Sequence, residues 1–173
     1  MSTAGSELSK EIKKNVIYRM DESLRMIEKS LSEVKEEEVW HRPNQASNSI
    51  GNIMVHLCGN ITQYILAGIG GNKDERQRDA EFTISGGISK EQLMADLISL
   101  IEQVKEVVDG LTDEQLIKYY KVQGFSLSGV GILMHVVEHL SYHTGQIAFW
   151  VKYLKAKDLQ FYSGIDLNIK NEN

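Results

Sequence analysis

The sequence predicts an all-α protein, a four-helix bundle with a long crossover between its second and third helices. Four segments carry apolar residues at steps of three or four, the spacing of one helical face. The 173 residues include one proline, Pro43, which permits long helices. The connection over residues 69–88 is longer than antiparallel neighbouring helices need. With 42% apolar and 25% charged residues, the chain is expected to form one domain over residues 1–173.

The first helix is predicted over about residues 6–36, where an apolar face alternates with Lys, Glu and Arg. A polar stretch at residues 42–49 ends this pattern. The second helix is predicted to begin at Ser47 or Ser49, because serine is a favourable N-cap residue. Glycines within residues 68–71 are expected to end it.

The connection over residues 69–88 is dense in charge in its middle, at residues 73–81. We interpret this middle part as a solvated loop, with a lid over a site as the alternative. A connection of this length suits a crossover, so the second and third helices are expected to run parallel.

The third helix is predicted to start at Ser89, with Gln92 reaching back to complete a capping box, and to end at Gly110. A second capping box, formed by Thr112 and Gln115, predicts one short turn of helix.

The fourth helix is predicted to begin near Ser126 or Ser128 and to run to about Lys155. The tail, residues 158–173, shows no clear period.

Composition excludes several classes of function. The net charge of −5 gives no broadly basic footprint, so no nucleic-acid partner is predicted. One cysteine, Cys58, excludes an internal disulfide framework. The N-terminus lacks the apolar core of a signal peptide and no long uncharged apolar run occurs, so we expect a cytoplasmic protein with no membrane span.

Three of the five histidines, His135, His139 and His143, lie on the predicted fourth helix at four-residue steps. Two imidazoles one turn apart can converge on one metal ion, with nitrogens about 2.0–2.1 Å from it. Three in a row cannot easily do so, because the first and third are about 12 Å apart along the axis. One adjacent pair therefore binds and the other histidine has another role. The spacing leaves open which pair it is.

A site with two histidines is incomplete, and a bundle usually draws its ligands from facing helices. His56 lies in the otherwise apolar second helix and is the natural third ligand. Three histidines with an open position are typical of catalytic metal sites. The alternative interpretation is that these histidines are hydrogen-bonded core residues without a metal.

Three segments resemble one family. Residues 138–147, Glu-His-Leu-Ser-Tyr-His-Thr-Gly-Gln-Ile, are similar to the C-terminal signature of the DinB-like (damage-inducible) superfamily. Residues 50–60 are similar to its first metal-ligand region, and residues 79–82, Asp-Ala-Glu-Phe, to one uncharacterised branch. The resemblance covers about residues 10–155.

The resemblance implies a four-helix bundle that holds a divalent metal, often zinc or nickel, through His56, His139 and His143. It implies that His135, one turn before the matching positions, lines the pocket or supports a ligand from behind. Relatives often form homodimers. Some are thiol S-transferases, which use the metal to activate a low-molecular-weight thiol such as bacillithiol or mycothiol.

Two further residues lie on the same faces as the histidines. Gln146 lies three residues after His143 and is a candidate to orient a water or substrate. Asn60 lies one turn after His56 and is a second such candidate. A structural hydrogen bond is the alternative for each, and no catalytic residue is assigned.

The sequence thus predicts a metal-dependent enzyme acting on a small molecule, as a thiol S-transferase or a hydrolase. The alternatives are a non-catalytic protein that binds a metal or small ligand, and a structural dimeric bundle. The residues do not fix the metal, the substrate or the dimer face.

Overall fold

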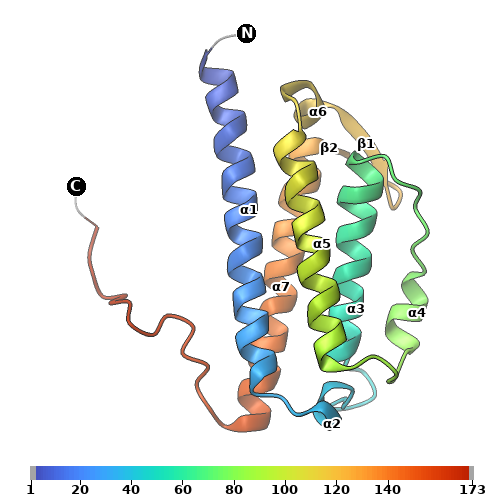
Figure 1. Cartoon of the computed structure of the whole chain (residues 1–173), viewed down its shortest axis with the longest axis vertical. Coiled ribbons are helices and arrows are strands. Elements are labelled where there is room, and N and C mark those ends of the chain that lie inside the picture. The colour runs from blue at the N-terminus through green and yellow to red at the C-terminus, as the bar shows by residue number, and fades with distance from the viewer. Residues whose placement is uncertain (1–2, 172–173) are drawn as a thin grey trace.

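The computed structural model describes residues 3–171, whose four long helices, α1, α3, α5 and α7, pack into a bundle (Figure 1). This confirms the all-α class. Among these residues no helix is both long and apolar enough to cross a membrane. The elements are α1 (Thr3–Ser32), α2 (Glu36–Val39), α3 (Ile50–Ile61), the π-helix η1 (Thr62–Ile69), α4 (Arg78–Thr83), α5 (Lys90–Gly110), α6 (Asp113–Ile117), β1 (Tyr119–Val122), β2 (Phe125–Ser128) and α7 (Gly129–Lys155).

The two helices on either side of the crossover, α3 and α5, run parallel, as predicted (Figure 1). Both start at the end of the bundle that carries α2, whereas α1 and α7 finish there. The crossover, over residues 70–89, returns along the outside of α3 and contains α4. Because α3 and α7 are antiparallel and in contact, side chains from the two can meet between them.

The first helix ends at Ser32 and not near residue 36 as predicted, and the separate turn α2 follows it. The chain bends there to meet the start of α5. Lys90 donates through Nζ to the carbonyl oxygen of Val34 (2.9 Å), and its backbone N–H lies 3.0 Å from a carboxylate oxygen of Glu36. These contacts satisfy backbone groups at the end of one helix and at the start of another.

Side-chain caps set the other helix starts. Ser49, one of the two predicted residues, accepts from the backbone N–H of Asn52 and begins α3. Ser128 does the same for α7, as expected. The capping box at Thr112 is complete, but the one at Ser89 is only half correct. Ser89 accepts from the backbone N–H of Gln92, while the Gln92 side chain donates to Asp96.

The second helix ends at Ile69, where the glycines predicted its end, but its last part was not predicted to be the π-helix η1. The short helices α2 and α4 and the hairpin of β1 and β2, which joins α6 to α7, were not predicted either. The hairpin turn has positive φ at Gln123 (52°) and Gly124 (82°). Tyr64 of η1 donates its hydroxyl to the Gln123 side chain (2.9 Å), which fixes the turn to the bundle.

The loop between α2 and α3 is held by Trp40, whose ring lies directly on Gly51. A Cβ atom at Gly51 would lie 2.7 Å from two ring carbons of Trp40, closer than packed carbons approach. The indole N–H donates to the carbonyl oxygen of Ile88 (3.0 Å), so one side chain joins α2, α3 and the end of the crossover. Glycine is needed at this position for a close approach.

We therefore expect Gly51→Ala to lower the free energy of unfolding by about 1–3 kcal/mol, the usual cost of overpacking. Urea denaturation followed by circular dichroism measures it. Gly145→Ala is the matched control, because a Cβ at Gly145 of α7 meets nothing within 4 Å. This control is expected to be neutral or stabilising. Equal effects of the two substitutions would contradict the packing argument.

Candidate metal centre

Three histidine side chains converge between α3 and α7. One nitrogen from each of His56, His139 and His143 lies within 4.8 Å of the others. The Nε2 atoms of His56 and His139 are 3.1 Å apart, and the rings of His139 and His143 lie with centroids 4.5 Å apart. The predicted trio therefore comes together, and of the two adjacent pairs on α7 it is the second that joins His56.

The spacing of these nitrogens suits a shared metal ion. Two nitrogens about 2.0–2.1 Å from one ion, at angles between tetrahedral and octahedral, lie about 2.8–3.4 Å apart. The 3.1 Å separation of His56 Nε2 and His139 Nε2 falls in this range. The cluster is compatible with a divalent metal site.

Glu81 fixes the orientation of His56. Its carboxylate oxygen Oε2 lies 2.8 Å from His56 Nδ1, and both side chains are buried. Because a carboxylate only accepts hydrogen bonds, Nδ1 carries the proton and donates it. The lone pair of His56 Nε2 is then free to face the other two histidines. A carboxylate behind a histidine is a common feature of metal sites, where it orients the ring and raises its basicity.

Arg76 holds Glu81 in place through two hydrogen bonds. Its Nε donates to Oε1 (2.7 Å) and its Nη2 to Oε2 (2.8 Å), a bidentate geometry that balances the buried carboxylate charge. Arg76 also donates through Nη1 to Gln63, whose side chain donates to Asp74. The expectation of a solvated loop at residues 73–81 is therefore wrong for Arg76 and Glu81, whose side chains are only 4% and 7% exposed.

Gly59 makes room for this carboxylate. A Cβ atom there would lie 2.0 Å from Glu81 Oε1, so only a hydrogen fits between α3 and the crossover. Glycine is unfavourable in a helix interior by roughly 1 kcal/mol relative to alanine. At Gly59, three residues after His56, the close approach of Glu81 accounts for it.

Gln146 orients His143 in a similar way. Its Oε1 lies 2.7 Å from His143 Nδ1, which makes this nitrogen the donor and leaves Nε2 free. Of the other two candidates, His135 stacks on Tyr64 (4.2 Å between centroids) and on His139 (5.6 Å). Asn60 is buried, and its Oδ1 has no hydrogen-bond partner among the described residues.

All three clustered histidines have lowered pKa values. Burial lowers the pKa of His56, and the hydrogen bond to Glu81 opposes this. Burial also lowers the pKa of His143. Burial, together with the neighbouring histidines, lowers the pKa of His139 to about 3. The three imidazoles are therefore neutral at pH 7, the form that binds metals.

Arg76 and Glu81 were not predicted as functional residues. A signal was present, because Glu81 lies in the segment at residues 79–82 that resembles one branch of the family. A second signal was chemical, since a buried histidine ligand needs an acceptor for its other N–H and the crossover carries acidic residues that can supply one.

Replacing Glu81 with Gln is expected to weaken zinc binding by about 10–100-fold, the usual effect of removing such an acceptor. Isothermal titration with a competing chelator measures the affinity. Glu75→Gln is the matched control, because Glu75 belongs to the same crossover but is exposed and pairs only with Lys73. An unchanged affinity in Glu81→Gln would refute the assigned role of the carboxylate.

The lowered pKa values also predict a pH dependence of stability. Between about pH 6.5 and pH 3 an unfolded histidine binds a proton, whereas His139 in the folded protein stays neutral. The unfolded state then holds more protons, so the free energy of unfolding of the metal-free protein falls as the pH drops through this window. The slope is at most about 1.4 kcal/mol per pH unit for one histidine, reduced by solvent screening.

Denaturant titrations of the metal-free protein across this window measure the slope. His139→Gln is expected to flatten it, while His41→Gln, at an exposed histidine, leaves it unchanged. A slope in His139→Gln equal to that of the wild type would count against the neutral cluster.

Comparison with known proteins agrees with this architecture. A DinB-like protein from Bacillus cereus is 16% identical, with a TM-score of 0.66 over 86% of this chain and 93% of that one. A DinB-like protein from Bacillus subtilis is 17% identical, with a TM-score of 0.65 over 86% of this chain and 96% of that one. A conserved protein from Enterococcus faecalis is 16% identical, with a TM-score of 0.64 over 91% and 99%. No curated protein matches the chain.

At these identities the likeness shows the fold, and the DinB-like resemblance is confirmed at that level. Residues 7–166 match the model of a family described as "Protein of unknown function (DUF1572)". The chain therefore belongs to the DUF1572 family and has a DinB-like fold.

Proposed function

We propose that the protein is a metal-dependent thiol S-transferase, in which His56, His139 and His143 hold one divalent ion, zinc or nickel. The observation that carries the proposal is the convergence of the three imidazoles, with Nδ1 of two of them already bonded elsewhere, to Glu81 and to Gln146. Three histidine ligands leave an ion at least one open position.

The ion would supply Lewis acidity, because three neutral ligands leave its 2+ charge intact and lower the pKa of a bound thiol or water. The protein's own groups orient the ligands and shield the cluster. Phe82 of α4 lies against His56, with centroids 4.8 Å apart, and the Tyr142 ring meets the edge of His143 at 5.1 Å. Two aromatic rings therefore contact the cluster.

The charges of the cluster favour thiol transfer over hydrolysis. Both oxygens of Glu81 are occupied by Arg76 and His56, so this carboxylate is not free to move a proton. The group that could hold a metal ion consists of three histidines, with no carboxylate among them. Hydrolysis often uses a free carboxylate or histidine to pass protons, although a metal-bound water is itself a nucleophile. A metal-bound thiolate attacks without such a group.

One cation near the cluster is available to a substrate. The guanidinium of Arg78 lies 5.0 Å from the centroid of the Phe82 ring, and it makes no ion pair within 4.0 Å among residues 3–171. A positive side chain beside a dication attracts anionic groups and speeds their encounter. This supports a thiol that carries carboxylates as the nucleophile.

We expect the purified, untagged protein to contain about one metal equivalent per chain, and His143→Ala to contain almost none. Inductively coupled plasma mass spectrometry after incubation with zinc or nickel measures both. His41→Ala is the control, since His41 is exposed and outside the cluster. Wild-type protein that binds neither metal would refute the site.

Activity is tested in two separate assays. The first combines low-molecular-weight thiols with a panel of electrophiles, and the second uses a panel of esters. Metal-dependent consumption of a thiol, lost in His143→Ala, is the expected result. If only the esters are turned over, the proposed reaction would be hydrolysis and not thiol transfer. Loaded protein that is inert toward both panels would support a non-catalytic metal-binding role.

A further inference from the structure

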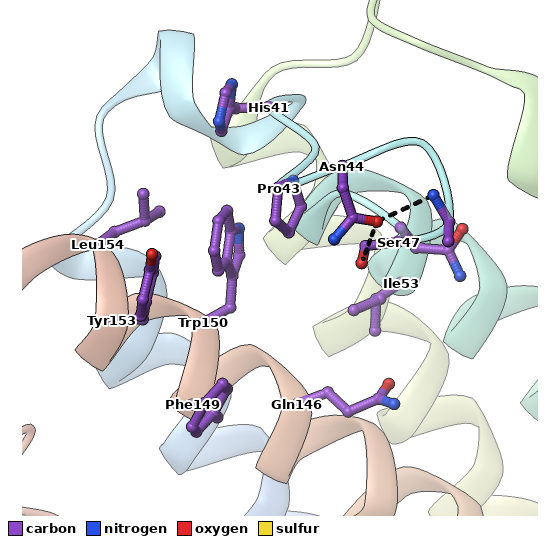
Figure 2. Close-up of a pocket in the computed structure, with 12 residues that line it drawn as sticks. His41, Pro43, Asn44, Ser47, Ile53, Gln146, Phe149, Trp150, Tyr153 and Leu154 are labelled. Carbon is purple, nitrogen blue, oxygen red and sulfur yellow. Dashed lines mark hydrogen bonds between the residues drawn. The ribbon is translucent and has the colours of Figure 1, made fainter.

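A pocket of about 790 Å³ opens between the loop of residues 41–48 and the C-terminal half of α7 (Figure 2). It lies next to the histidine cluster. Ile53 precedes His56 by three residues on α3, and Gln146 follows His143 by three residues on α7, and both line the pocket. Three residues rise about 4.5 Å along a helix, so the pocket begins roughly one turn from the ligands.

One wall of the pocket is aromatic. Phe149, Trp150 and Tyr153 all come from α7, and the Trp150 and Tyr153 rings stack with centroids 5.5 Å apart and planes 13° apart. Phe149 and Tyr153 are each 72% exposed, so much of Phe149 and the part of Tyr153 not stacked on Trp150 are left open. Aromatic faces of this kind attract flat, apolar groups by stacking.

The opposite wall offers a hydrogen-bond donor. Asn44 Oδ1 already accepts from the backbone N–H of Ala46 (2.9 Å) and from the Ser47 hydroxyl (3.0 Å). Its amide nitrogen is directed away from these bonds (Figure 2). A side-chain amide whose oxygen is occupied presents only its two N–H groups to a ligand.

One more donor lies on α7. Gln146 uses its oxygen toward His143, which leaves its amide N–H groups free. The indole N–H of Trp150 also has no hydrogen-bond partner among the described residues, but its nitrogen is buried, so a ligand in the pocket does not reach it. The pocket therefore offers the amide donors of Asn44 and Gln146 and favours a ligand that brings acceptors.

No acidic or basic side chain lines the pocket apart from the exposed His41, so a charged ligand group would lose its hydration without a counter-charge.

We propose that this pocket binds an uncharged aromatic molecule bearing carbonyl-type acceptors, and that this molecule is the electrophilic substrate. The second part rests on the proposed function and names the substrate class for it. Stacking on Tyr153 holds the ring, the amide N–H groups of Asn44 and Gln146 hold the acceptor, and Gln146 also places the bound molecule beside His143.

The test uses para-fluoroacetanilide, an unreactive ring with one neutral amide, followed by fluorine NMR on the metal-free full-length protein. We expect it to bind more tightly than para-fluorophenylacetate, which keeps the ring but carries a charge. Tyr153→Ala is expected to weaken binding about fivefold, as expected for the loss of one aromatic contact. Tyr18→Ala is the control, at an exposed tyrosine on α1 that does not line the pocket.

Three results would each overturn the pocket assignment. They are equal affinity of the probe for Tyr153→Ala and wild type, tighter binding of the charged probe, and no binding by a protein that light scattering shows to be a dimer, in which a second copy would cover the pocket. A second measurement loads the protein with cobalt. Enhanced relaxation of the bound fluorine places the pocket beside the metal, while binding without enhancement overturns the substrate role. Protein that binds the probe but no metal refutes the proposed function and the substrate role, and leaves the binding pocket standing.

Discussion

The buried contact of His56, Glu81 and Arg76 joins the parts of this protein that carry its chemistry. A carboxylate and a guanidinium are costly to bury, and each is tolerated because the other is present. Glu81 uses one oxygen on Arg76 and shares the other with the ring of His56. The crossover is therefore fixed to α3 by the same group that sets the histidine tautomer. Loss of either partner would leave an unpaired charge against the cluster.

The bundle supplies the rest of the geometry. Parallel packing of α3 and α5 requires a crossover, and the crossover is what brings Glu81 back to α3, 25 positions along the chain from His56. Antiparallel packing of α3 and α7 sets a single histidine opposite a pair one turn apart. Gln146 then belongs to both the cluster and the neighbouring pocket. The substrate and metal proposals are linked through this residue.

Local patterns predicted most of the helices, because helical periodicity and caps such as Ser128 and Thr112 depend on residues within a few positions. The end of α1 was not predicted in this way, and the bend that follows it is held in part by Lys90, from far along the chain. The role of Glu81 was not predicted for the same reason, because its partner His56 lies 25 positions away in the chain. The four-residue spacing of the histidines left two possible pairs of metal ligands on α7. The resemblance favoured His139 and His143. The packing of α3 against α7 brings that pair to His56.

The arrangement of lone pairs argues against a packed, metal-free histidine cluster. With the protons of His56 and His143 held on Nδ1 by Glu81 and Gln146, their Nε2 lone pairs face inward. His139 Nε2 lies only 3.1 Å from that of His56. A single proton on His139 can satisfy one of these acceptors but not both. Selection for packing alone would favour apolar side chains, which fill such a space without unmatched acceptors. A cation shared by all three nitrogens satisfies them at once, and neutral imidazoles at pH 7 are ready to accept it.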